Sequence, residues 1–210
     1  MINKGLLIVI SGPSGAGKGT ICKELLSKND DLNLSISATT REPRKNEIDG
    51  KNYFFLTKEK FEHMIGDDEF LEYANVYGNY YGTPKKYVDE LLNGGKNVIL
   101  EIDIQGALKV KEMYKDGVFI FIMPPSMKEL KNRIKKRGSE TEESLLTRFK
   151  SAYKEINYVS KYNYVVINDV VETAAQKIES IIIAEKCRVD RYKDNIFNSR
   201  EGLLHEQFYD

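Results

Sequence analysis

The stretch Leu6–Thr20, LLIVISGPSGAGKGT, decides the fold of this chain. Its first part, Leu6–Ile10, is an apolar run with the length of a buried strand, and beyond Thr20 apolar residues recur at the spacing of a helix. The glycines between them let backbone N–H groups turn toward the oxygens of a phosphate, and the start of the helix adds the positive end of its dipole. A glycine-rich turn between a strand and a helix therefore predicts a phosphate-binding loop.

The loop also supplies charged and hydroxyl groups for a nucleotide. Lys18 carries a mobile positive charge for the β- and γ-phosphates, which makes it a candidate catalytic residue. Such loops usually carry Ser or Thr directly after the lysine, but here that position is Gly19, so Thr20 is the candidate hydroxyl on the magnesium side. The predicted ATP contacts of the loop are Gly12, Pro13, Ser14, Gly15, Ala16, Gly17, Lys18, Gly19 and Thr20.

Three later apolar runs have the length of buried strands, and a stretch with helical features follows each one: residues 97–102, 118–123 and 164–167. Ser126 and Glu129 have the spacing of a capping box at a helix start, and Asp169 with Glu172 has a similar character. Strands that alternate with helices form crossover units. The sequence therefore predicts an α/β fold, with a mostly parallel sheet that helices cover on both faces.

Residues 39–95 interrupt this alternation. The segment is polar, aromatic and rich in turns, and it contains six of the thirteen tyrosines, which either fill a small core or contact a ligand. Within it, Thr83 and Pro84 are predicted to be the N-cap and the first residue of a helix. We therefore predict a core of residues 1–38 and 96–190, an inserted subdomain of residues 39–95, and a C-terminal tail of residues 191–210.

Composition excludes several classes of protein. The 32 basic and 32 acidic side chains give a formal charge of zero, which argues against general binding to nucleic acid or membranes. The apolar run near the start is far shorter than the ~20 residues of a membrane span, so the chain is expected to be cytoplasmic. Cys22 and Cys187 lie far apart in the sequence, which suits a reducing compartment, and both are interpreted as small packing residues.

Arginine is scarce in this chain and clustered. Only eight of the 32 cations are arginines, and five of these fall in two short windows, Arg41 with Arg44, and Arg133 with Arg137 and Arg148. The planar guanidinium is a better bidentate partner for phosphate than an ammonium, so both windows are candidate phosphate contacts. The alternative is chance clustering on a solvent-exposed face.

A phosphate loop alone indicates nucleotide binding and does not choose a reaction. GTPases read guanine with an Asn-Lys-x-Asp segment, and none occurs at a suitable place in this sequence. Motor ATPases are usually longer chains. A small kinase needs a second site for the phosphate acceptor and a cover that excludes water, and the inserted segment and the second arginine window are candidates for these two parts.

Several further motifs follow in a fixed order. SATTREPR (37–44) and DGKNY (49–53) are succeeded by FLEYA (70–74), GNYYGT (78–83), LEIDIQG (100–106), Arg137-Gly138, the helix that carries Arg148, and Asn168-Asp169. From about Leu6 to Arg188 the sequence resembles the guanylate kinase family, whose members phosphorylate GMP with ATP. The resemblance implies a P-loop NTPase-type fold with an inserted GMP-binding subdomain and a helical lid at about residues 133–150.

The resemblance implies a site for GMP. One group of residues would hold its phosphate and a second would surround its base: Arg41, Arg44, Tyr53 and Tyr81, and then Ser37, Glu72, Thr83 and Asp103. Guanine presents two adjacent donors, which the single carboxylate of Glu72 can accept together, whereas adenine presents an acceptor at N1. A buried carboxylate facing adenine would lose its partners, so adenine should be rejected on the order of 10⁴-fold. The alternative for Glu72 is a solvent-exposed acid within a strand.

The resemblance also assigns residues to ATP and to the reaction. Arg133 and Asn168 would contact ATP, with Asn168 near the adenine, and Glu101 would lie near Mg²⁺, through water. A solvated basic helix is the alternative for the lid, and a strand-end turn residue is the alternative for Asn168. Arginines on a lid neutralise the transferring phosphoryl group only after closure, which favours transfer over hydrolysis. The expected charge-stabilising catalytic residues are Lys18, Arg41, Arg137 and Arg148.

We therefore expect a cytosolic guanylate kinase that transfers the γ-phosphoryl of ATP to GMP, giving ADP and GDP, by direct in-line transfer with Mg²⁺. ATP, GMP and dGMP are expected partners, nucleic acid and membranes are not, and the chain is expected to be a monomer or a homodimer. Two alternatives remain. One is a catalytically inactive module that binds proteins, and the other is a kinase for another nucleotide, such as AMP or UMP.

Overall fold

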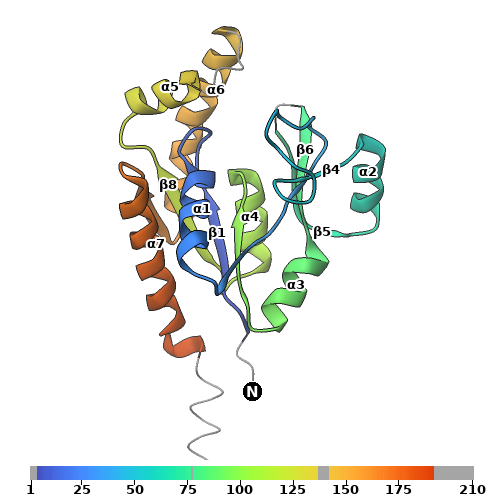
Figure 1. Cartoon of the computed structure of the whole chain (residues 1–210), viewed down its shortest axis with the longest axis vertical. Helices are drawn as coiled ribbons and strands as arrows, with labels where there is room; N and C mark the ends of the chain where they lie inside the picture. Colours follow the sequence, from blue (N-terminus) through green and yellow to red (C-terminus); the bar gives the residue numbers. More distant parts are fainter. Residues whose placement is uncertain (1–3, 77, 137–141, 192–210) are drawn as a thin grey trace, which may run out of the picture.

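The structure, a computed structural model, describes residues 4–76, 78–136 and 142–191, without the side chains of residues 136 and 142–148. Five strands form the larger sheet in the order β2-β7-β1-β8-β9, and each pairing between them is parallel (Figure 1). The strands are β1 (Leu7–Ser11), β2 (Leu32–Leu34), β7 (Asn97–Glu101), β8 (Val118–Met123) and β9 (Tyr164–Ile167). The predicted α/β class and parallel sheet are confirmed.

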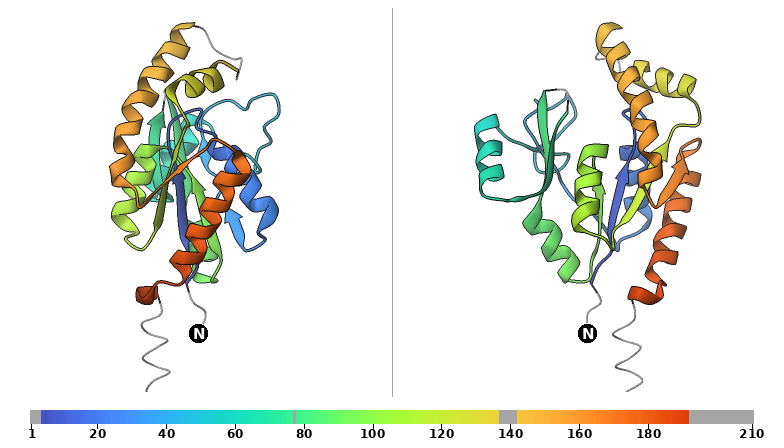
Figure 2. Two further views of the ribbon diagram at one scale, coloured as in Figure 1. Left: turned by 90° about the vertical axis from the view of Figure 1, so that its left-hand side faces the viewer. Right: turned by 180° about the vertical axis from the view of Figure 1, so that it is seen from behind.

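Helices cover both faces of this sheet (Figure 2), because successive residues of a strand point to opposite sides. Ile8 and Ile10 of β1 pack on one face in a cluster with α1 and α7, whereas Leu7 and Val9 pack on the other face with α3 and α4. These helices are α1 (Lys18–Lys28), α3 (Lys85–Asn93), α4 (Ile104–Met113) and α7 (Val171–Lys186). The apolar run of β1 thus fills both halves of the core.

The two cysteines differ in burial. Cys22 of α1 is buried in the first of these clusters, as predicted. Cys187 is exposed, so the packing role predicted for it is wrong. The reason is its position, since Cys187 caps the end of α7 and lies beyond the residues that this helix packs on the sheet.

A smaller sheet forms between β2 and α3, with the strand order β4-β3-β6-β5. Its elements are β3 (Ala38–Thr39), β4 (Phe54–Phe55), α2 (Lys58–Gly66), β5 (Phe70–Val76) and β6 (Asn79–Pro84). Phe61 of α2 is fully buried, and its ring stacks on those of Phe70 and Tyr80. The bounds of the inserted subdomain stay a prediction, and α3, which they include, packs Val88 and Leu92 into the core of the larger sheet.

Three predicted helix starts have different outcomes. Ser126 caps the helix after β8, because its hydroxyl accepts a hydrogen bond from the N–H three residues later. Thr83 does not cap a helix: Pro84 still belongs to β6, and the Thr83 hydroxyl donates to the buried carboxylate of Glu72. Asp169 does not cap α7 either. Its carboxylate accepts a hydrogen bond from the N–H of Val170, and the helix begins only at Val171.

Helices α5 (Met127–Lys136) and α6 (Glu142–Ile156) pack on each other through Leu130, Ile134 and Ala152. They stand at the end of the larger sheet where β1 and β8 finish (Figure 1). Together they contain most residues of the predicted lid, about 133–150. Short 3₁₀ helices, η1 (Asn157–Lys161) and η2 (Val189–Arg191), follow α6 and α7. Residues 137–141 and the tail from residue 192 lie outside the described part of the chain. Within that part, no helix combines the length and apolarity needed to cross a membrane.

Candidate functional site

A cleft of about 220 Å³ lies between the phosphate loop and the smaller sheet. Its walls bring together most of the predicted residues: Gly12, Ser14, Gly15, Gly17, Lys18, Gly19, Ser37, Arg41, Arg44, Tyr53, Glu72, Tyr81, Glu101 and Asp103. Among the predicted residues whose side chains the structure describes, those that do not line it are Pro13, Ala16, Thr20, Thr83, Arg133 and Asn168. Parallel strands end on one side of their sheet, which is why β1 delivers the loop and β7 the two acids to the same place.

A larger hollow of about 1260 Å³ lies at the opposite end of the same sheet, where it is lined by Leu6, Asn97 and Gly117 beside the first residues of β1, β7 and β8. Its lining contains no residue of the phosphate loop or of the smaller sheet. Ligands of open α/β sheets collect at the carboxyl ends of the strands. The smaller cleft is therefore the candidate site.

The phosphate loop turns sharply because three of its glycines, Gly12, Gly15 and Gly17, adopt a backbone that other residues rarely reach. Gly12 has a φ of 144°, and a Cβ there would lie 2.4 Å from the carbonyl oxygen of Ile122. Gly17 has a φ of 95°. The Lys18 ammonium donates to the carbonyl oxygen of Gly12 at 2.6 Å and to that of Pro13 at 3.3 Å. Its positive charge is thus held at the loop, beside the cleft.

Asn168 and Arg133, the two further predicted ATP contacts, lie behind the loop. Asn168 Nδ2 donates to the carbonyl oxygen of Ala16 at 2.7 Å, and Arg133 Nη1 lies 3.5 Å from the same oxygen. Glu129 fixes Arg133 in turn, with 2.9 Å between Nε and the carboxylate. The structure therefore brings both residues to the loop and not to the wall of the cleft.

Arg41 is the centre of a charged and aromatic group in the cleft. Its Nε donates to the Tyr81 hydroxyl at 3.2 Å, and its Nη2 lies 2.9 Å and 3.0 Å from the two oxygens of Glu47. Its guanidinium carbon lies 5.5 Å from the ring centre of Tyr53, and burial raises the pKa of that tyrosine to about 12. Arg44 is more exposed and lies 3.9 Å from Glu47. Sequence reasoning missed Glu47, whose carboxylate forms ion pairs with both arginines.

Glu72 lies at the closed side of the cleft. It is 6% exposed, and its Oε1 accepts a hydrogen bond from the Thr83 hydroxyl at 2.8 Å. Burial raises the pKa of the Glu72 carboxyl to about 7; the Thr83 hydroxyl lowers it and the charge of Asp103 raises it. Asp103 caps α4, because its Oδ1 accepts the Gly106 N–H at 2.8 Å. The predicted base contacts are therefore grouped together, with Thr83 reaching the site through Glu72.

Glu101 is the predicted metal-side carboxylate, and it lies against the loop. Both oxygens of Glu101 lie 3.3 Å from the place that a Cβ of Gly19 would take. Thr20 is exposed and does not line the cleft, because each step along α1 turns the next residue away by about 100°. The structure thus does not bring Thr20 to Glu101. Among the described residues, no three His, Cys, Asp or Glu side chains are grouped as a metal centre.

Helix α6, which lies partly within the predicted lid, contributes a residue to the cleft that was not predicted. Glu155 lines the cleft and accepts a hydrogen bond from the Ser14 N–H of the phosphate loop. Burial raises the pKa of Glu155, and the positive charge of Lys18 lowers it. The sequence offers one signal for Glu155: it lies seven residues after Arg148, and residues seven apart share one face of a helix. Of the predicted lid arginines, Arg148 is described only by its position in α6, and Arg137 lies outside the described residues.

Comparison with known proteins agrees with this geometry. Residues 4–185 match the family model described as guanylate kinase. A guanylate kinase of Clostridium perfringens (strain 13 / Type A) is 72% identical over 99% of this chain and 96% of its own length, and one of Clostridium tetani (strain Massachusetts / E88) is 70% identical over 100% of both. The crystal structure of guanylate kinase from Anaplasma phagocytophilum has a TM-score of 0.79 at 34% identity, and the match covers 98% of this chain and 96% of that one. A family match over most of the chain, with relatives at this identity, means that the chain belongs to the guanylate kinase family.

Proposed function

We propose that this protein transfers the γ-phosphoryl of ATP to GMP, giving ADP and GDP, within the cleft between the phosphate loop and the smaller sheet. The reaction is that of its family. The observation that carries the proposal is that one cleft has Lys18 on one wall and Arg41, Tyr81 and Glu72 on the other. A phosphate loop facing a pocket with arginines and an acid suits transfer between two bound nucleotides.

The reaction needs alignment and charge neutralisation, without a covalent intermediate on the enzyme. In our proposal Lys18 leaves the loop carbonyls to meet the β- and γ-phosphates of ATP. Arg41 and Arg44, with Tyr53 and Tyr81, hold the phosphate of GMP, so that an oxygen of GMP attacks in line. Arg41 must then exchange Glu47 for this phosphate. Arg137 and Arg148 remain the predicted lid arginines that neutralise the transferring group.

Base selection in this proposal depends on Glu72. Its buried carboxylate, with Ser37 and Asp103 beside it in the cleft, would accept the two donors of guanine. Thr83 supports it by donating to Oε1 at 2.8 Å. Because guanine keeps the same donors on a deoxyribose, dGMP is proposed as a second acceptor. Burying Glu72 against adenine would leave it without partners, which disfavours AMP.

The residues present suit a magnesium ion that stays largely hydrated. Glu101 directs its carboxylate at the first turn of α1, and Mg²⁺ is commonly bound by one or two carboxylates, substrate phosphates and waters. Glu101 would hold such an ion through water, and Thr20 stays a weaker candidate because it is exposed. When bound, the ion would neutralise charge on the phosphates. A cytoplasmic location without nucleic acid or membrane partners, as a monomer or homodimer, remains part of the proposal.

The test is a coupled assay of ADP release with ATP and each of GMP, dGMP, AMP, CMP and UMP as acceptor. We expect turnover with GMP and dGMP only. Turnover with AMP or UMP would favour a kinase for another nucleotide, and silence with every acceptor would favour an inactive binding module.

Lys18→Met is the matched variant, and it should lower turnover by orders of magnitude while the circular dichroism spectrum is unchanged.

A further inference from the structure

Asn168 is buried where β9 ends, with its amide directed at the phosphate loop. It is 2% exposed, and its backbone is fixed on both sides: the N–H donates to the Met123 carbonyl at 2.8 Å, and the carbonyl accepts Arg133 Nη2 at 3.1 Å. Its side-chain Nδ2 donates to the carbonyl oxygen of Ala16 at 2.7 Å. Its Oδ1 is buried and has no hydrogen-bond partner among the described residues. The amide therefore uses its donor on the loop.

The position of the Ala16 carbonyl decides where the next N–H points. A trans peptide is planar, so the C=O of Ala16 and the N–H of Gly17 point in opposite directions. Asn168 holds the C=O on the far side of the loop, and Gly17 lines the cleft whereas Ala16 and Asn168 do not. The Gly17 N–H is thus turned toward the side where a phosphate would bind.

Gly17 and Asn168 also fit each other sterically. A Cβ on Gly17 would lie 2.2 Å from Asn168 Nδ2, so the amide fills the space that the absent side chain leaves. Arg133 reinforces the same anchor from α5, since its Nη1 lies 3.5 Å from the Ala16 oxygen and its Nε is held by Glu129. Two segments that are distant from the loop in sequence, α5 and the end of β9, therefore converge on one of its carbonyls.

We propose that Asn168 is a positioning residue for the phosphate loop: through the Ala16 carbonyl it orients the loop amide that receives the donor phosphates, and it does not read the adenine base. The inference rests on the proposed function, since it concerns how the same site holds ATP. The burial of Asn168 carries it, because a residue that is 2% exposed has little surface to offer to a base. A base contact and a loop contact make different demands on the ligand. A base contact requires adenine, whereas a loop contact requires only phosphates.

The experiment compares a ligand that has a base with one that has none. Dissociation constants of the β,γ-imido analogue of ATP and of inorganic tripolyphosphate are measured by calorimetry, with Mg²⁺ and saturating GMP, for wild type, Asn168→Ala and Asn168→Asp. Both variants lose the donor to Ala16, while the aspartate keeps the size and the acceptor oxygens. Losing this hydrogen bond and leaving the carbonyl unpaired should weaken both ligands by about 10- to 100-fold and by the same factor.

Asn163→Ala is the matched control. Asn163 immediately precedes β9, and its Oδ1 accepts the Phe119 N–H at 3.0 Å, so its loss perturbs the same strand away from the loop. It should leave both dissociation constants within about twofold. A weaker ATP analogue with unchanged tripolyphosphate would overturn the proposal in favour of a base contact, and so would unchanged binding of both ligands to Asn168→Ala. Turnover of GMP by the wild type is measured separately, so a failed function is distinguished from a failed role for Asn168.

Discussion

At the scale of single residues, Glu72 has two conflicting requirements. In its proposed role it must be ionised to accept both donors of guanine, yet its burial raises the pKa of its carboxyl to about 7. The free protein therefore keeps a proton on Glu72 at neutral pH much more often than an exposed glutamate would. If Glu72 reads the base as proposed, binding of GMP has to release that proton, which couples the affinity for GMP to pH.

We therefore predict that GMP binds more tightly as the pH rises toward about 7 and that this gain levels off above it. Below the pKa the gain from Glu72 should approach tenfold per pH unit. The measurement is the dissociation constant of GMP by calorimetry between pH 5.5 and 8.5, at about half-unit intervals, in buffers of different ionisation enthalpy that count the released protons.

The control for this prediction is Glu72→Gln. The phosphate of GMP also titrates, near pH 6, so only the difference between the wild type and this variant isolates the carboxyl. If the wild type and Glu72→Gln show parallel curves of GMP affinity against pH, Glu72 does not read the base.

The raised pKa of Glu72 also affects the free energy of unfolding. Because the pKa is higher in the folded protein than in the unfolded chain, the contribution of Glu72 to stability is fully present below the pKa of the unfolded chain. It is lost as the pH rises through about 7.

Gly106 provides a second test of the same pocket. A Cβ at this position would lie 2.3 Å from Glu72 Oε2, and a buried carboxylate has little room to move. Gly106→Ala should therefore raise the KM for GMP by about tenfold or more and change the KM for ATP by less than about twofold. Gly66→Ala is the matched control, because a Cβ there would meet nothing within 4 Å. Equal losses for both substrates would indicate a general structural defect.

The residues of the proposed acceptor pocket were predicted from the resemblance to guanylate kinases, and only the scarce arginines Arg41 and Arg44 stood out from the composition as well. Glu47 could not be predicted, since an acid in a polar loop has no pattern of its own and its role depends on how this loop folds back onto Arg41, six positions earlier. Thr83 was misread as a helix cap for a related reason. Thr-Pro is a strong local signal for a helix start, but the hydroxyl is used instead by Glu72, a partner on the neighbouring strand.

At the scale of elements, α6 connects the predicted lid to the phosphate loop. Arg148 lies in the middle of the helix, and Glu155, two turns later, accepts the Ser14 N–H of the loop. One helix therefore connects the predicted lid to the phosphate loop.

We predict that Glu155→Gln lowers kcat/KM for ATP by about 3- to 10-fold, because a charge-assisted hydrogen bond to the loop becomes a neutral one. The KM for GMP should change by less than about twofold, since Glu155 contacts the loop and not the smaller sheet. The measurement is steady-state kinetics with each substrate varied in turn. Lys154→Gln, on the exposed side of the same helix, is the control. A matching loss in Lys154→Gln would show that the helix charge in general, and not the loop contact, matters.

Most long elements of the fold could be predicted, and the shortest could not. The apolar runs that became β1, β7, β8 and β9 were visible because each extends over four to six residues. β2 is three residues long and β3 and β4 are two, which is too short for a period to appear. They exist because a neighbouring strand offers backbone partners, as β7 does for β2.

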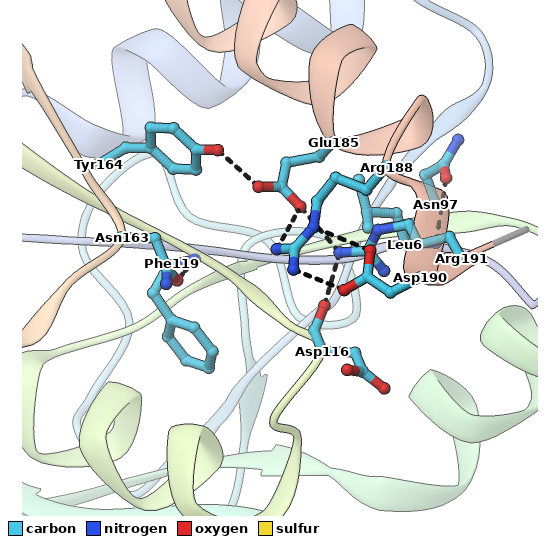
Figure 3. A network of polar contacts seen from close by, with 10 residues as sticks. All are labelled: Leu6, Asn97, Asp116, Phe119, Asn163, Tyr164, Glu185, Arg188, Asp190 and Arg191. Atoms are coloured by element: carbon cyan, nitrogen blue, oxygen red, sulfur yellow. Dashed lines mark hydrogen bonds and ion pairs between the residues drawn. The ribbon is translucent and has the colours of Figure 1, made fainter. Parts of the chain in front are cut away.

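At the scale of the whole molecule, a network of polar side chains lies at the end of the larger sheet that is remote from the cleft (Figure 3). Glu185 of α7 is 4% exposed and accepts hydrogen bonds from the Tyr164 hydroxyl at 2.5 Å and from Arg191 at 2.9 Å. Arg191 also donates to the backbone oxygen of Asp116 at 2.8 Å, and Arg188 lies 3.4 Å from Glu185. The network ties the end of α7 to the edge strand β9 and to the turn before β8.

Glu185→Ala should therefore lower the stability of the protein by about 1–3 kcal/mol, because the part-buried Tyr164 hydroxyl and Arg191 guanidinium lose their acceptor. The KM values for ATP and GMP should stay unchanged, because the cleft lies at the other end of the sheet. Urea unfolding and steady-state kinetics check the two parts. Lys177→Ala, on the exposed face of α7, should change stability by less than about 0.5 kcal/mol. A change in KM would mean that the two ends of the sheet are coupled.

The position of β1 at the centre of the larger sheet has a consequence for synthesis on the ribosome. Both neighbours of β1, β7 and β8, are encoded much later, and the Leu6 N–H finds its partner Asn97 91 positions downstream. At about 5–20 residues per second, the first strand waits roughly 5–20 s outside the exit tunnel before it can pair. All strands of the smaller sheet emerge during that interval. The nascent chain must therefore keep one of its most apolar segments out of aggregates until the middle of the polypeptide has been made.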